Sequence, residues 1–279
     1  MTTTPALTLS APVNLRDLGG IPVAGGVVRE GFALRADDLA LVTDDVARGL
    51  VDGGVRAIID LRSTDELGVT GRGPLGTHSN VSYHHVPLLA DIGAAAGDAG
   101  AHLARSTEMA AEMMDQTRFG RMYLRMYEGA SPQIVTALAI IAHAPGTVAF
   151  HCAAGQDRTG VLAASLLLAL GADQDHIVAD YVRTGENSAA IMARISPVMR
   201  PLMSRFGIEL DAAALAAVST EFSPAPMHEL FAALTERHGD PLAPLRAAGL
   251  TDGLVAQLRS RALAGSGTGT APGTATGTA

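Results

Sequence analysis

The sequence predicts an α/β protein with a central, mostly parallel β-sheet flanked by helices, and with a helical C-terminal part. Two observations support this class. Short apolar runs that suit buried strands alternate with helical patterns between residues 43 and 171, whereas residues 173–263 show helical patterns alone. Open sheets of this kind bind ligands at the carboxyl ends of their parallel strands, so the loops that follow the strands are the first places to search for a site.

The first predicted elements lie in the N-terminal third of the chain. Thr43 is a favourable N-cap for a helix over residues 44–51, and the glycine pair that follows ends this helix. An apolar strand is predicted at residues 55–61. Alternating side chains predict another strand at residues 81–86, which stops at Pro87.

Residues 90–130 form a predicted helical insertion. They are rich in alanine and methionine and contain few strand formers, and their length allows two helices. The insertion either packs on the sheet or covers the ligand site. Ser131 as an N-cap, with Pro132 at the first helical position, predicts a further helix over residues 133–143.

The most informative stretch lies between a strand and a helix. Residues 146–150 are a short apolar run that predicts a strand, and residues 161–170 are an apolar run closed by Gly171, as expected for a buried helix. Residues 151–160, with the sequence His-Cys-Ala-Ala-Gly-Gln-Asp-Arg-Thr-Gly, are therefore a strand-to-helix loop.

This loop has the composition of an anion-binding nest. Ala153, Ala154 and Gly155 have little side-chain bulk, so successive backbone N–H groups can turn inward, and the helix N-terminus adds partial positive charge. Cys152 at the base of the nest would be stabilised as a thiolate nucleophile. Arg158 could hold two phosphate oxygens with its planar fork. A cysteine and an arginine separated by five residues also occur by chance, so the prediction depends on the strand, small residues and helix around them.

The loop resembles the signature loop of cysteine-dependent phosphatases, and in its longer form that of the bacterial tyrosine phosphatase family related to a secreted mycobacterial enzyme. The resemblance covers about residues 12–263 in order, with matching segments at 14–20, 54–63, 177–181 and 245–250. It implies the cysteine-dependent phosphatase fold and a helical lid over the active site, formed by the insertion. We find no composition break, so we expect one catalytic domain over residues 1–263.

The resemblance also implies a two-step reaction. Cys152 attacks phosphorus to form a phosphocysteine, which water then hydrolyses, while Arg158 and the backbone of the nest bind the phosphoryl group. The family usually has a lysine where this chain has Gln156, so a role of that lysine does not carry over. Thr159 is expected either to donate its hydroxyl to the sulfur or only to cap the following helix.

Two aspartates compete for the role of general acid. The resemblance implies Asp157, which lies inside the loop. The alternative is Asp91, which follows the strand at residues 81–86 at the place where many dual-specificity phosphatases carry their acid on a separate loop.

Supporting residues are expected around the loop. His151 is expected to brace the loop by hydrogen bonding and not to transfer a proton. Arg16 and Asp17, just before a glycine pair, either position the loop or form a surface turn. A buried polar network is expected to include three further side chains: Arg35, Asp60 and Arg62.

Composition limits the partners and the location. The net charge is −8, and all twenty basic residues are scattered arginines, which does not favour nucleic acid or an anionic membrane surface. The longest apolar run, residues 161–170, is too short to span a bilayer. A single cysteine excludes an intrachain disulfide and suits a reducing compartment. The first ten residues lack a signal pattern, so we expect a cytoplasmic location, although the resemblance includes exported proteins without an obvious signal.

No cofactor or metal is expected. His84 and His85 alternate across a strand and have no cluster of further ligands at suitable spacing. Residues 264–279 consist of Gly, Thr, Ala, Ser and Pro without periodicity or charge and are expected to be a disordered tail. The sequence leaves the oligomeric state open.

The predicted function is a metal-independent phosphomonoester hydrolase, with protein phosphotyrosine as the substrate that the resemblance implies. A small phosphorylated metabolite and a phosphoinositide are alternatives, and the missing cation at Gln156 disfavours polyanionic headgroups. Sulfur transfer and arsenate reduction are disfavoured by loop spacing and by the lack of further cysteines. A non-catalytic phosphate-binding module would not need Cys152.

Overall fold

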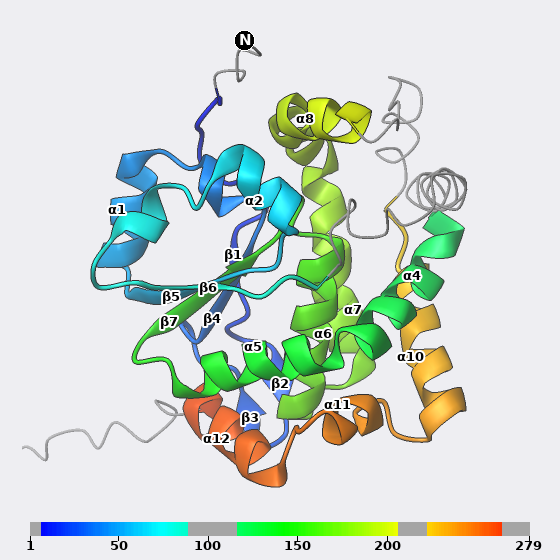
Figure 1. The fold of residues 1–279 in the computed structure, drawn as a ribbon. Helices are drawn as coiled ribbons and strands as arrows, with labels where there is room; N and C mark the ends of the chain where they lie inside the picture. Colours follow the sequence, from blue (N-terminus) through cyan, green and yellow to red (C-terminus); the bar gives the residue numbers. More distant parts are fainter. Residues whose placement is uncertain (1–6, 89–115, 206–221, 264–279) are drawn as a thin grey trace, which may run out of the picture.

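The computed structural model describes residues 7–88, 116–205 and 222–263, and it confirms the predicted α/β class (Figure 1). A five-stranded sheet has the order β1-β4-β7-β5-β6, in which β1 is antiparallel to β4 and the other neighbours are parallel. A small antiparallel hairpin joins β2 to β3. The strands are β1 (Arg16–Asp17), β2 (Pro22–Val23), β3 (Gly26–Val27), β4 (Ala33–Ala36), β5 (Val55–Asp60), β6 (Ser82–His85) and β7 (Thr147–His151).

Helices surround this sheet and make up most of the chain after β6. In the described part of the chain they are η1 (Leu39–Leu41), α1 (Asp44–Asp52), α2 (Thr64–Thr70), η2 (Pro74–Thr77), α4 (Gln116–Gly129), α5 (Ser131–His143), α6 (Asp157–Leu170), α7 (Gln174–Val182), η3 (Arg183–Asn187), α8 (Ser188–Arg205), α10 (Ala225–His238), α11 (Ala243–Ala247) and α12 (Asp252–Leu263). None of these described helices has both the length and the apolar content that a bilayer span requires.

The two faces of the sheet belong to two apolar clusters. Val148 and Phe150 of β7 face the larger cluster, which includes α4, α5, α6, α10 and α12. Ala149, between them, faces the smaller cluster with α1, η1 and η2. This alternation follows from the two-residue period of a strand. In Figure 1, α1 accordingly lies on the opposite side of the sheet from α5 and α6.

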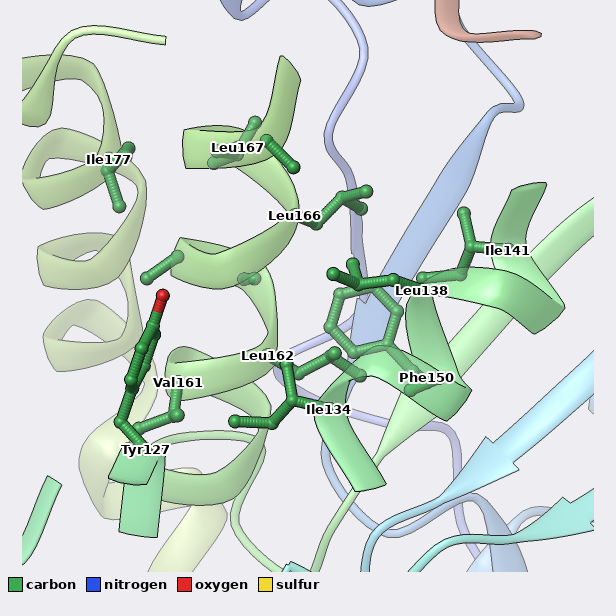
Figure 2. Packing of buried hydrophobic residues seen from close by; sticks show 14 of the residues in the cluster. Tyr127, Ile134, Leu138, Ile141, Phe150, Val161, Leu162, Leu166, Leu167 and Ile177 are labelled. Carbon is green, nitrogen blue, oxygen red and sulfur yellow. The ribbon is translucent and has the colours of Figure 1, made fainter. Parts of the chain in front are cut away.

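The larger cluster holds the reactive segment of the chain in place. Figure 2 shows Leu138 and Ile134 of α5 beside Leu166 and Leu162 of α6, respectively, with the ring of Phe150 of β7 close to Leu138. All five side chains are fully buried. Burial of a large aliphatic or aromatic side chain contributes about 1.5–3 kcal/mol, so β7 and α6 are firmly anchored on both sides of the loop between them.

The predicted strands at residues 55–61, 81–86 and 146–150 are confirmed as β5, β6 and β7, with ends that differ by one residue. The cap at Thr43 is also confirmed, since its hydroxyl accepts a hydrogen bond from Val46 N at 3.3 Å. Gly171 ends α6 in the left-handed conformation, as predicted for a glycine after a helix.

Two predicted helix starts were wrong. Helix α6 begins at Asp157 and not at residue 161, because the second half of the reactive loop already has helical geometry. Ser131 does not cap α5 but is its first residue. Its hydroxyl instead donates to the Tyr127 carbonyl at 2.7 Å, and so satisfies the end of α4.

Several predictions fall on parts of the chain outside the described residues. Of the insertion at residues 90–130, the structure describes the second helix, α4, and residue 130; the predicted first helix and Asp91 lie outside. The expected tail at residues 264–279 also lies outside the described residues. The predicted helical C-terminal part is confirmed by α7, α8, α10, α11 and α12.

Candidate active site

The candidate active site is the loop between β7 and α6. Strand β7 is the middle strand of the five, with β4 and β5 on its two sides. It ends at His151, and α6 starts at Asp157, so only residues 152–156 form the turn between strand and helix. The loop therefore lies at the carboxyl end of a central parallel strand, where the sequence predicted a ligand site.

Three carbonyl groups of the loop are held by donors outside it. The Asp38 N–H donates to the Ala153 carbonyl at 3.0 Å. The side-chain amide of Asn14, just before β1, donates to the carbonyls of Ala154 and Gly155, each at 3.2 Å. These bonds turn three consecutive carbonyls away from the inside of the loop.

The opposite ends of the same peptide groups point inward. In a trans peptide the C=O and the following N–H point in opposite directions, and all peptides in the described residues are trans. Outward carbonyls at residues 153–155 therefore aim the N–H groups of Ala154, Gly155 and Gln156 at the centre of the loop. Three converging N–H groups at a helix N-terminus form the predicted nest for an oxyanion.

Gly155 is required at its position for two reasons. Its φ is +69°, in the left-handed region, and a Cβ on it would lie 2.6 Å from Ala36 O and 2.7 Å from Asp37 N. The nest is thus pressed directly against the backbone that follows β4. A larger residue would have to move either the loop or that backbone.

Gly155→Ala is expected to destabilise the protein by about 3 kcal/mol or more and to abolish phosphate binding, because backbone strain and a backbone collision add. Gly239→Ala is the matched control: its φ is +74°, but a Cβ there meets nothing within 4 Å. We expect the control to lose only about 1–2 kcal/mol. Urea unfolding of both variants measures the difference, and equal losses would contradict the role of the close approach to Ala36.

Cys152 lies at the base of the nest and is 1% exposed. The Thr159 hydroxyl donates to its sulfur at 3.2 Å. The alternative interpretation of Thr159 as the helix N-cap is wrong, because Gln156 occupies that position and Thr159 lies in the first turn of α6. The structure thus pairs the thiol with a donor that can stabilise negative charge on sulfur.

Arg158 is held by Glu66, which sequence reasoning missed. Arg158 Nη2 donates to Glu66 Oε1 at 2.9 Å, and its Nη1 bonds the other carboxylate oxygen. Glu66 is fixed in turn by a capping box at the start of α2: its carboxylate accepts from Ser63 N at 2.8 Å, and Ser63 Oγ accepts from Glu66 N. The pattern Ser63-Thr64-Asp65-Glu66 is a visible signal for this box, although not for its distant partner.

Glu66 and Arg158 stabilise each other in their charged forms. Burial by itself raises the pKa of Glu66, but the adjacent Arg158 outweighs burial and holds that pKa below its ordinary value. Burial likewise lowers the pKa of Arg158, but the Glu66 and Cys152 charges raise it above its ordinary value overall. Arg158 is therefore a cation whose orientation is set before a substrate arrives, with three N–H groups left by Glu66.

Asp157 lies in the first turn of α6, next to Arg158, and is half-buried. Its Oδ1 accepts a hydrogen bond from the hydroxyl of Tyr123 on α4 at 2.6 Å. Desolvation raises the pKa of Asp157, although the Tyr123 bond and the Arg158 charge oppose it. The structure thus places a carboxyl with a raised pKa beside Arg158.

A second layer of charge supports the loop from the side of β1 and α7. Arg16 Nη1 donates to Asn14 Oδ1 at 2.5 Å, and Arg16 Nε pairs with Asp180 Oδ1 at 2.8 Å. Arg35 pairs with the other oxygen of Asp180 and also donates to the Gly155 carbonyl at 2.9 Å. Arg16 therefore acts on the loop through Asn14, while Arg35 contacts it directly.

Asp17 is outside this layer, although the sequence grouped it with Arg16. Its carboxylate accepts from Gly19 N at 2.8 Å and from Gly31 N at 2.6 Å. It joins two turns at the edge of the sheet, as in the alternative of a turn residue. Successive residues of a strand point to opposite sides, which explains why the adjacent Arg16 reaches the loop and Asp17 does not.

A third layer lies beneath His151. Its Nδ1 accepts from Leu39 N at 3.3 Å, and its Nε2 is 3.9 Å from Asp60 Oδ1. Arg62 holds Asp60 with Nε at 2.9 Å and Nη2 at 2.6 Å, and reaches Asp38 with Nη1 at 3.1 Å. Burial lowers the pKa of His151. The ring is therefore neutral and connects the end of β7 to the segment that holds the Ala153 carbonyl.

Three further contributors were not predicted as site residues from the sequence: Asn14, Tyr123 and Asp180. Each acts over a long sequence separation and has no local pattern of its own. His84 and His85 both lie on β6, and His85 Nε2 bonds the Arg62 carbonyl at 2.8 Å. In the described ranges, no group of three or more His, Cys, Asp or Glu side chains could hold a metal ion.

A thiol at the base of a nest, with a preset arginine beside it, has the equipment for phosphoryl transfer through sulfur. The protein is a phosphatase that hydrolyses phosphoric monoesters. Residues 7–264 match the model of the tyrosine phosphatase family, and the chain belongs to that family.

Individual relatives agree with this assignment. The chain is 32% identical over 219 residues to the triple specificity protein phosphatase PtpB of Mycobacterium tuberculosis. The aligned region covers 71% of this chain and 74% of that protein. It is also 32% identical over 213 residues to a protein of Cupriavidus necator that is named provisionally as a tyrosine-protein phosphatase, with the same two shares covered. A tyrosine-protein phosphatase of Nostoc commune is 30% identical over 151 residues, 53% of this chain and 46% of that protein.

Proposed function

We propose that the chain is a metal-independent protein-tyrosine phosphatase that works through a phosphocysteine intermediate on Cys152. The observation that carries this proposal is the coincidence of three groups around one position: the Cys152 sulfur, the inward N–H groups of Ala154, Gly155 and Gln156, and the guanidinium held by Glu66. A phosphate bound in the nest would lie next to the residue that carries the sulfur, since Cys152 directly precedes the nest in the chain.

In the first step, the Cys152 thiolate attacks phosphorus, and the bond between phosphorus and the ester oxygen breaks. The leaving oxygen takes the proton of Asp157. The nest and Arg158 stabilise the charge on the three remaining phosphoryl oxygens, and they need little rearrangement because both are preset.

In the second step, water attacks the phosphocysteine and gives a proton to the Asp157 carboxylate. The S–P bond breaks, phosphate forms, and the electron pair returns to sulfur. The Thr159 hydroxyl, 3.2 Å from the sulfur, stabilises the departing thiolate. Both Cys152 and Asp157 are thereby restored to their initial forms.

Protein phosphotyrosine is the proposed substrate, and relatives named as tyrosine-protein and triple specificity protein phosphatases support it. Gln156 is uncharged and adds no cation to the loop for a polyphosphorylated headgroup. Its identity supports phosphotyrosine over a phosphoinositide. The requirement for a free thiol supports a cytoplasmic location, with export as the alternative.

The test is an assay of the purified protein on para-nitrophenyl phosphate with and without EDTA, followed by a substrate panel. We expect the same kcat with and without chelator. Phosphotyrosine peptides should give a kcat/KM at least about tenfold above that of phosphoserine peptides, a soluble phosphoinositide and sugar phosphates. Activity that disappears with EDTA would contradict the mechanism, and preference for a sugar phosphate or phosphoinositide would contradict the substrate.

A further inference from the structure

A row of hydroxyl groups leads from α7 to Asp157. The Tyr181 hydroxyl of α7 lies 2.8 Å from the Tyr123 hydroxyl of α4, and the Tyr123 hydroxyl lies 2.6 Å from Asp157 Oδ1. Three helices, α4, α6 and α7, therefore contribute to one row of hydrogen bonds beside the nest.

The chemistry of these groups sets a direction along the row. A tyrosine hydroxyl can donate one bond while it accepts another. Because the Tyr123 hydroxyl donates its single proton to Asp157 Oδ1, the Tyr181 hydroxyl is the donor to Tyr123. Bonds in series also polarise one another, which strengthens each of them.

Both tyrosines are fixed by packing. Tyr123 is fully buried and Tyr181 is 2% exposed. Their rings meet edge to face with centroids 6.0 Å apart, Phe119 stacks on Tyr123, and Phe222 packs on Tyr181 at 4.9 Å. Burial, together with the adjacent Asp157, raises the pKa of both tyrosines, so each stays a neutral hydroxyl that can donate. The donor at Asp157 therefore has a defined position.

We propose that Tyr123, supported by Tyr181, is a positioning residue that holds Asp157 by Oδ1 and so keeps the transferable proton on Oδ2. This proposal rests on the proposed role of Asp157 as general acid.

The charged and titratable groups that face Asp157 are few in the described residues. They are Tyr123 on α4, Tyr181 on α7 and Arg158 on α6 itself. Arg158 is common to every variant considered below. The Tyr123 bond favours the carboxylate form, so its removal should raise the pKa of Asp157 further and move the loss of activity to higher pH.

The test compares Tyr123→Phe with wild type on phenyl phosphate and on 6,8-difluoro-4-methylumbelliferyl phosphate, which has a far better leaving group. At the optimum pH, kcat on phenyl phosphate should fall about tenfold, because general-acid catalysis contributes roughly 10²–10⁴-fold in all. The fluorinated substrate should lose no more than about twofold. The descending limb of the phenyl phosphate pH profile should move upward by about one unit.

Tyr127→Phe is the matched control. Tyr127 lies one turn later on α4 and is equally buried, but its hydroxyl donates to the Pro241 carbonyl at 2.9 Å, and Figure 2 shows it beside Val161 of α6. The Tyr127→Phe substitution removes a buried tyrosine hydroxyl, as Tyr123→Phe does, but that hydroxyl does not contact Asp157. We expect its pH profile and leaving-group dependence to match those of wild type.

Tyr181→Phe keeps the proposal testable if Tyr123→Phe does not fold. It leaves the direct Tyr123 bond but removes its neighbour, so a smaller upward shift of the same limb is expected. An unchanged limb in the folded variants would overturn the positioning role. If Asp157→Asn retains the descending limb of the pH profile, Asp157 is not the general acid, and that result is distinct from the ones above. If the limb moves equally in Tyr123→Phe and Tyr127→Phe, the shift reflects general destabilisation, and the positioning role is overturned.

Discussion

Cys152→Ser is expected to lower kcat on para-nitrophenyl phosphate by more than about 10⁴-fold. A serine hydroxyl is a weak nucleophile unless a base removes its proton. The partner of the Cys152 sulfur in the structure is the Thr159 hydroxyl, which donates and cannot act as that base. The Nδ1 of the neighbouring His151 already accepts from Leu39 N. Neither of these two neighbours can therefore activate a serine hydroxyl at this position.

The same variant should retain the nest. Serine differs from cysteine only in having oxygen in place of sulfur. The hydrogen bonds to the carbonyls of residues 153–155 do not involve the side chain of Cys152. Calorimetric titration with tungstate, a phosphate-like oxyanion, should give a Kd within about threefold of wild type. Turnover within 100-fold of wild type, in protein with an unchanged Tm, would contradict covalent catalysis by sulfur.

Asp157→Asn is expected to lower kcat on phenyl phosphate by about 10²–10³-fold. Phenolate is a poor leaving group and needs a proton as its bond to phosphorus breaks. An asparagine of the same shape accepts the Tyr123 bond but has no proton to transfer at this step. Hydrolysis of 6,8-difluoro-4-methylumbelliferyl phosphate should change by less than about fivefold, since that phenolate leaves unaided. Equal losses on the two substrates would exclude Asp157 as the acid.

The pH profile supplies a second readout for this variant. Desolvation raises the pKa of Asp157, so the wild-type enzyme holds the proton to higher pH than an ordinary aspartate and loses activity as pH rises through that pKa. Asparagine does not titrate. The descending limb should therefore be absent in Asp157→Asn, while the ascending limb stays. If the descending limb remains in Asp157→Asn, the limb reports the titration of another group. Asp91 is the alternative that the sequence offers.

The reactive loop could be predicted because its signals are local. The strand, the small residues and the following helix lie within about 25 residues, and the nest follows from them. Asn14 shows the limit of such reasoning. It lies in a segment that matches the family, yet its contact with the Gly155 carbonyl joins residues 141 apart, and no periodicity connects the two.

Glu66 was missed for a related reason. The segment Ser63-Thr64-Asp65-Glu66 has the pattern of a capping box, from which no helix was predicted, and the structure contains this box. The carboxylate has a second duty toward Arg158, 92 residues further along, which depends on how α2 is placed against β7 and α6. The local sequence pattern indicates the capping box but gives no information about the ion pair with Arg158. Tyr123 is comparable: its buried position marks a core residue, and only the fold brings its hydroxyl to Asp157.

The contacts that shape the loop also order its assembly during synthesis. Asn14, Arg16 and Arg35 precede the loop in the chain, whereas Asp180, which pairs with both arginines, follows it. Arg16 and Asp180 are 164 residues apart. The loop can therefore be held on all sides only after α7 has been synthesised, because a chain that stops before Asp180 lacks the partner that orients Arg16 and Arg35.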